Sequence, residues 1–213
     1  MKKSVIIVMG IILASFAIGI YFYPLMPENV ASHWNAQGNV DDYMPKFWGL
    51  FLMPLALAGL SLFFLSIPKI DPLKENIEKF RKYYDGLIVI LALFLFYVYF
   101  LIIIWNVGVK FNMAYVLMPA IAVLFYYIGI LLDNSKKNWF IGIRTPWTLS
   151  DDKVWDKTHK IGGRLFKACA IVAIFGLFFS NYAILFMVIP VILTSIYTFI
   201  YSFFEYKKIK NKE

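Results

Sequence analysis

The side chains best suited to chemistry lie in residues 141–159, which read IGIRTPWTLSDDKVWDKTH. Arg144 beside a Thr-Pro-Trp turn could bind a phosphate, and His159 near Asp156 could act as a base. The stretch offers no second histidine, no thiol, no glycine-rich phosphate loop and no convincing nucleophile–base pair. We therefore expect no catalytic residue, and interpret Arg144 as a partner for a carboxylate, a lipid phosphate or a tryptophan ring.

A second candidate site surrounds His33, which is near Glu28, Asp41 and Asp42 in the sequence. A histidine with several carboxylates could bind a metal ion, but zinc ligands normally follow a tighter spacing than this set shows. We expect His33 to be hydrogen-bonded within its loop, with no metal and no cofactor.

These polar stretches interrupt a chain whose composition is that of a membrane protein. Apolar residues make up 61% of the 213 positions and charged residues 16%, whereas a soluble domain has about 25% charged residues. Most of the six apolar runs reach the roughly 20 residues that span a bilayer, and in lipid such runs form helices. The composition predicts an all-α polytopic bundle with six transmembrane helices, the first of them retained. The runs are residues 4–23, 47–67, 87–105, 113–132, 165–180 and 182–204.

The distribution of basic residues gives the orientation. With a cytoplasmic N-terminus, 19 of the 21 Lys and Arg residues face the cytoplasm, leaving only Lys46 and Lys110 outside. We predict a multi-pass protein of the cytoplasmic membrane with both termini cytoplasmic. The bilayer explains the net charge of +8, so no direct nucleic-acid partner is expected.

The runs themselves contain no Asp, Glu, Arg or His, and Lys167 is close enough to the end of its run to reach the interface. Coupled transporters usually keep ionisable groups at membrane depth. This absence argues against an ion-coupled pump. The single Cys169 cannot form an intramolecular disulfide.

Three segments position the polar stretches. Residues 1–67 form a two-helix module with an outer His-Trp-Asn loop, in which VASHW could be one strand of a hairpin. Residues 68–112 provide an inner connector, the third span and a short outer loop. Residues 113–213 provide the last three spans and the inner loop that contains the RTPW turn.

The connector, residues 68–86, places Ile77, Phe80 and Tyr84 on one helical face. It is either a short amphipathic helix at the lipid headgroups or a solvated connector.

The inner loop predicts a second short helix. Thr148 with Asp151 three residues later resembles a capping box. The helix would run to about Lys160 and end at residues 162–163, which are both glycine. It would rest on the membrane face with Trp155 at headgroup level.

Residues 138–166 resemble the signature of the SdpI-type family of bacterial membrane immunity proteins, with its Gly-x-Arg-Thr-Pro-Trp-Thr pattern. A looser module that often precedes it resembles the outer loop. The inner match falls on Gly142, Arg144, Thr145, Pro146, Trp147, Thr148, Trp155, Thr158 and His159, and the outer one on Pro27, His33, Trp34, Asn35, Gly38, Asp41, Asp42 and Tyr43.

The resemblance implies a non-enzymatic membrane protein that protects its producer from a secreted toxic peptide, and in the best-known member it also implies recruitment of a cytoplasmic repressor. A toxin arrives from outside, so we expect His33 and Trp34 to anchor it. A repressor can reach only the inner surface, where Arg144 and Trp147 belong to residue types that are common at interaction hot spots. Trp155 and His159 complete this expected surface.

Two other classes stay open. A small-molecule permease or exporter would use the inner motif as a gate, and flux in proteoliposomes would reveal it. A membrane-embedded enzyme would need Arg144 and His159 to converge on one pocket with a carboxylate.

Overall fold

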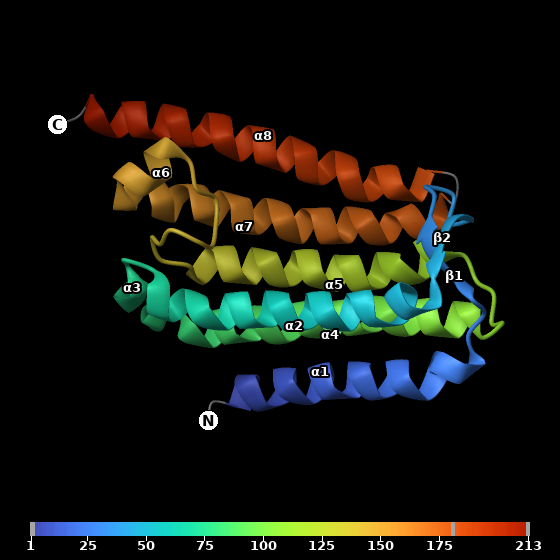
Figure 1. The fold of residues 1–213 in the computed structure, drawn as a ribbon. Helices are drawn as coiled ribbons and strands as arrows, with labels where there is room; N and C mark the ends of the chain where they lie inside the picture. Colours follow the sequence, from blue (N-terminus) through green and yellow to red (C-terminus); the bar gives the residue numbers. More distant parts are fainter. Residues whose placement is uncertain (1–2, 180–181, 212–213) are drawn as a thin grey trace.

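The computed structural model describes residues 3–179 and 182–211. Six of its helices are long and apolar enough to cross a membrane, which confirms the predicted bundle. Figure 1 shows them side by side with parallel or antiparallel axes. They are α1 (Lys3–Phe22), α2 (Lys46–Ile70), α4 (Arg81–Asn106), α5 (Met113–Asn134), α7 (Asp152–Phe175) and α8 (Ala183–Lys210).

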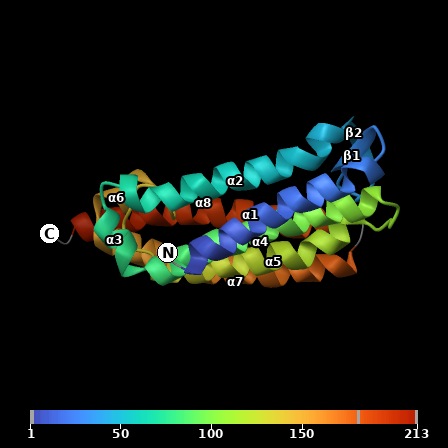
Figure 2. The ribbon, with the colours of Figure 1, turned by 60° about the horizontal axis from the view of Figure 1, so that its bottom comes forward.

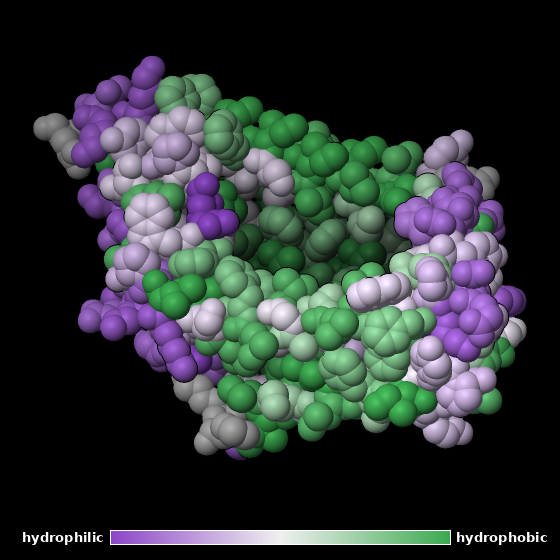
Figure 3. All heavy atoms as spheres, viewed as in Figure 1, coloured by the Kyte–Doolittle hydropathy of each residue, from purple (hydrophilic) through white to green (hydrophobic). Residues whose placement is uncertain are grey.

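The bundle has two halves. Helices α1, α2 and α4 pack on one another, α7 packs on both α5 and α8, and the α4–α5 contact joins the halves. Figures 1 and 2 show α1 and α8 on opposite sides of the bundle. Apolar side chains cover the middle of the molecule in Figure 3 and line a hollow between α2 and α8, while polar side chains gather at both ends.

The two ends of the bundle differ in structure. At one end, which we call the hairpin end, β1 (Asn29–Trp34) and β2 (Val40–Pro45) form an antiparallel hairpin after the short 3-10 helix η1 (Tyr23–Leu25). The all-α prediction therefore needs this small correction, and VASHW is a strand as expected. At the other end, the basic end, lie α3 (Lys74–Lys79) and α6 (Pro146–Ser150), together with the start of α1 and the end of α8 (Figure 1).

The predicted helix end at residues 162–163 is wrong, because α7 continues without a break to Phe175 and is followed by the 3-10 helix η2 (Gly176–Phe178). These glycines allow other segments to pack closely on α7, and a Cβ on Gly162 would lie 2.3 Å from Cδ1 of Ile143 in the loop. A Cβ on Gly163 would lie 2.2 Å from Asp133 Oδ1 and 2.8 Å from the Gly129 carbonyl oxygen of α5. Small residues at such contacts bring helix backbones together.

The predicted capping box is also displaced along the chain. Thr145 caps α6, and its hydroxyl accepts from the Thr148 amide at 3.1 Å while the Thr148 hydroxyl accepts from the Thr145 amide at 2.9 Å. Asp151 separately caps α7 by accepting from the amides of Lys153 and Val154.

The connector packs onto the bundle. Ile77, Phe80 and Tyr84 are all buried and belong to one apolar cluster with Val8 and Ile67. The predicted apolar face therefore contacts protein, and α3 is a single short turn rather than an extended surface helix.

Candidate functional site

The RTPW segment, residues 138–150, is anchored to α8 by hydroxyl and aromatic contacts. Thr145 Oγ1 and Ser202 Oγ share a hydrogen bond of 3.0 Å, and both side chains are buried. Trp147 packs edge-on against Phe199 and Phe203, with ring centroids 5.1 Å apart in each case. Pro146 fits at the first position of α6, where no backbone donor is required.

His159 holds the segment from the α7 side. Its Nε2 accepts from the Ile143 amide at 2.9 Å, and its Nδ1 donates to the Trp155 carbonyl at 2.8 Å. The neutral imidazole with the proton on Nδ1 satisfies both bonds. Gly142 has φ +120°, and a Cβ there would lie 2.4 Å from Nε2. Since both ring nitrogens are used, His159 is a structural acceptor and not a free base.

Trp155 is buried instead of lying at headgroup level, so the expectation of a helix resting on the membrane face is wrong. Its ring stacks on His159 with centroids 3.9 Å apart, and Nε1 donates to the Ser135 carbonyl at 3.2 Å. Trp155 and His159 are each 1% exposed and Thr158 is 0% exposed. The first turns of α7 are packed inside the protein because the RTPW segment folds over them.

Arg144 is exposed, in contrast to this buried group. Its Nη1 donates to the Trp139 carbonyl at 2.5 Å, and no carboxylate in residues 3–179 or 182–211 lies within ion-pair distance of it. The expected carboxylate or tryptophan-ring partner is therefore replaced by a backbone carbonyl. Arg144 and His159 do not form one catalytic pocket.

Two buried polar residues that the sequence reasoning missed hold the start of the segment. Asp71 is 2% exposed, and its two oxygens accept from the Leu73 amide at 2.6 Å and the Trp139 amide at 2.9 Å. Asn138 is 0% exposed. Its side-chain amide donates to the Ile141 carbonyl through Nδ2 and accepts from the Ile141 amide through Oδ1. The Asp71-Pro72 step marks a helix end in the sequence, but nothing local indicates its partner 68 residues away.

At the hairpin end, His33 is hydrogen-bonded within its loop, which confirms that expectation. Its Nδ1 lies 2.5 Å from Asp41 Oδ1. Asn35 accepts from the amides of Gln37 and Asn39 at 3.0 Å each, and Gly38 has φ +80°. Asn35 and Gly38 therefore build the turn rather than a ligand surface.

Two further asparagines, also missed from the sequence, fasten the hairpin to the bundle. Asn106 of α4 accepts from the Ala31 amide at 2.8 Å and donates to the Ala31 carbonyl at 3.0 Å. Asn112 donates to the Gln37 carbonyl at 2.7 Å. Pro27 and Tyr43 stay exposed, and Asp42 accepts from the Tyr43 amide at 2.8 Å.

Trp34, which belongs to the predicted outer site, has a side-chain hydrogen-bond donor without a partner among the described residues. Its ring packs edge-on against Trp105 at 5.6 Å. Its Nε1 is shielded from solvent and has no hydrogen-bond acceptor in the described structure. The ring borders a cavity of about 110 Å³ whose other walls include Met113, Met118 and Met187.

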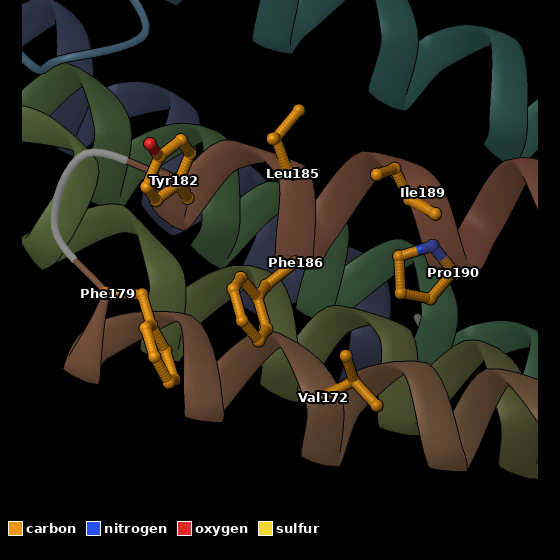
Figure 4. A pocket seen from close by; sticks show the side chains of 7 residues that line it. All are labelled: Val172, Phe179, Tyr182, Leu185, Phe186, Ile189 and Pro190. Carbon is orange, nitrogen blue, oxygen red and sulfur yellow. The ribbon is translucent and has the colours of Figure 1, made fainter.

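An apolar cavity of about 490 Å³ lies between α7 and α8 towards the hairpin end. Figure 4 shows its lining, in which Phe179 and Phe186 stack at 5.0 Å and Val172, Ile189 and Pro190 add further apolar surface. This cleft suits hydrocarbon chains and contains no arrangement for catalysis. Within the described ranges, no three His, Cys, Asp or Glu side chains gather as a metal site.

Comparisons with known proteins find similarity at the level of the sequence. Residues 134–202 match the SdpI/YfhL protein family, and residues 10–58 match a domain of unknown function, DUF1648. The immunity protein SdpI of Bacillus subtilis (strain 168) is 26% identical to the chain over 211 residues, which cover 98% of each protein. No solved structure matches. The predicted resemblance is therefore confirmed: the chain is similar over nearly its whole length to an SdpI immunity protein, and its residues 134–202 match the SdpI/YfhL family.

Proposed function

We propose that this membrane protein protects its cell from a secreted membrane-active peptide by capturing the peptide at the hairpin end. In this proposal the hairpin faces outwards and the basic end faces the cytosol, as the positive-inside rule predicts. The similarity to an immunity protein over nearly the whole chain supports the protective role. The division into residues 1–67, 68–112 and 113–213 stays a prediction.

The unsatisfied indole N–H of Trp34 carries the proposed place of capture. A buried donor without an acceptor costs about 1–3 kcal/mol, so a ligand that supplies one gains that energy back. The adjoining cavity is apolar and rich in methionine, a side chain that adapts to ligands of irregular shape. A peptide would place an apolar side chain in the cavity and a backbone carbonyl against Nε1.

Survival of a toxin-sensitive strain tests this proposal. Cells that express the chain are challenged with graded concentrations of secreted membrane-active peptides, and membrane amounts of the protein are matched. Trp34→Phe keeps an aromatic ring against Trp105 and removes the donor. It should lower the highest peptide concentration that the cells survive by about 5- to 160-fold, the equivalent of the 1–3 kcal/mol regained when the buried donor is satisfied.

Trp48→Phe is the matched control, because Trp48 is exposed on α2 near the hairpin. It should leave protection unchanged. Equal protection by the Trp34→Phe variant and the parent would reject capture at this site, and absence of protection by the parent chain would reject the immunity function.

The basic end supports a second candidate, recruitment of a cytoplasmic repressor. The structure exposes Arg144, with Trp139 50% exposed beside it, and both residue types are common at interaction hot spots. The buried residues Thr148, Trp155 and His159 would support this surface without contacting the partner. Arg144→Ala should abolish toxin-dependent recruitment of a tagged repressor and leave protection intact; retained recruitment would reject the surface.

The two alternative functions, a membrane-embedded enzyme and a small-molecule permease or exporter, have less support than the immunity function. The enzyme reading required Arg144 and His159 in one pocket, and the two side chains have separate partners. A permease or exporter is tested by solute flux in proteoliposomes.

A further inference from the structure

A polar cavity of about 230 Å³ lies at the basic end, where the last turn of α5 meets the second turn of α7. Its charged lining consists of three lysines and two carboxylates, and it also includes Ser135 and the edge of His159. The charged residues are Asp133, Lys136, Asp156, Lys157 and Lys160. Ligand pockets for drug-sized molecules are typically about 300–1,000 Å³, so this cavity suits a smaller polar group.

The charges of the lining are only partly compensated. Lys136 pairs loosely with Asp156 at 3.3 Å, and both side chains are about half exposed. Lys157 pairs with Glu205 of α8, and Asp133 pairs with Lys167 of α7.

Lys160 has no carboxylate partner among the residues that the structure describes. The ion pairs therefore leave one uncompensated positive charge at the cavity, which matches a monoanion.

The cavity lies just beyond the apolar stretch of α5, which ends at Leu132, and this is the level where lipid headgroups are expected. Gly163 packs beside Asp133, so the end of α5 is level with this part of α7. Lys160 is three residues, or about 4.5 Å along the helix, nearer the basic end than Gly163. A lysine there reaches the headgroup layer while its stem covers apolar surface.

We propose that this cavity binds the phosphate group of an anionic phospholipid, with Lys160 and Lys136 as its cationic partners. A phosphodiester carries the single negative charge that the lining lacks, and lysine binds phosphate as a point charge. The carboxylates Asp133 and Asp156 would repel the anion, but each is paired with a lysine, Asp133 with Lys167 and Asp156 with Lys136. Lys136 also accepts a hydrogen bond from Asn138 at 2.8 Å through its carbonyl, so the bound lipid would brace the RTPW segment.

Binding of labelled phosphatidylglycerol and phosphatidylcholine to the full chain in mixed micelles tests the proposal. The parent should bind phosphatidylglycerol preferentially. In the variant Lys136→Gln/Lys160→Gln the affinity for phosphatidylglycerol should fall about 30-fold, as expected for two lysines at an anionic surface. The control Lys74→Gln/Lys153→Gln removes the same charge from exposed residues at the same end that do not line the cavity.

A second variant acts in the opposite direction. Asp156→Asn releases Lys136 from its ion pair and should tighten binding of phosphatidylglycerol. An equal loss in the control variant, or weaker binding by Asp156→Asn, would overturn the site. Competition by millimolar inorganic phosphate as effective as competition by the lipid would assign the cavity to a free anion and overturn the lipid.

Discussion

Replacing Gly142 by alanine should detach the RTPW segment from His159. A non-glycine residue at φ +120° costs about 1–3 kcal/mol of backbone strain. The new Cβ would also lie 2.4 Å from His159 Nε2, and such overpacking in a closed site costs a further 1–3 kcal/mol or so. Neither the ring nor the loop can move freely, because Nε2 already accepts from Ile143. We expect a total loss of about 2–6 kcal/mol in the free energy of unfolding.

A double-mutant cycle separates the two contributions. In a His159→Ala background the imidazole is absent, so Gly142→Ala should cost only the backbone part, about 1–3 kcal/mol. The coupling between the two positions should therefore be about 1–3 kcal/mol. Denaturant titration in mixed micelles, followed by circular dichroism, measures all four proteins.

Gly59→Ala provides the control, since a Cβ at Gly59 in α2 would meet no atom within 4 Å. It should leave stability unchanged or raise it by about 0.5–1 kcal/mol. A loss for Gly142→Ala that is the same with and without His159 would refute the packing that we describe.

Two further changes test other contacts. Asn106→Ala removes both bonds to Ala31 and should cost about 1–3 kcal/mol and expose the hairpin to protease, whereas Asn134→Ala removes one bond within its own helix and should leave the hairpin protected; equal cleavage in both would contradict the anchoring role. Asp133→Asn leaves Lys167 unpaired between α5 and α7 and should lower thermal stability more than the double variant Asp133→Asn/Lys167→Met. Equal stability of the two variants would contradict a cost for the unpaired lysine.

The six helices could be predicted from composition because the bilayer imposes their length and forces backbone hydrogen bonds inside each one. The length of α7, which runs from Asp152 to Phe175, could not be predicted in this way. Two adjacent glycines normally favour a helix end. Only the tertiary contacts show that Gly162 packs closely against Ile143 and Gly163 against α5. Residues 152–164 therefore belong to the same helix as the fifth apolar run.

The sequence predicts which residues of the RTPW segment lie together, but it does not predict which of them are buried. The matched types in the RTPW segment do gather at one place, yet Trp155 and His159 are interior supports whereas Arg144 is exposed. Burial of this kind depends on contacts distant in sequence, such as the Trp139 amide on Asp71. No local pattern encodes such a contact.

The opposite placement of the two ends underlies both the toxin capture and the repressor recruitment, and cysteine labelling of intact cells tests it most directly. Cys169 is buried and is first replaced by alanine. Single cysteines are then introduced at Gln37 in the hairpin turn and at Ser150 in α6, both of which are exposed. A membrane-impermeant maleimide should label the Gln37→Cys variant in intact cells and the Ser150→Cys variant only after lysis. Labelling of Ser150→Cys from outside intact cells would contradict the orientation and both proposals that depend on it.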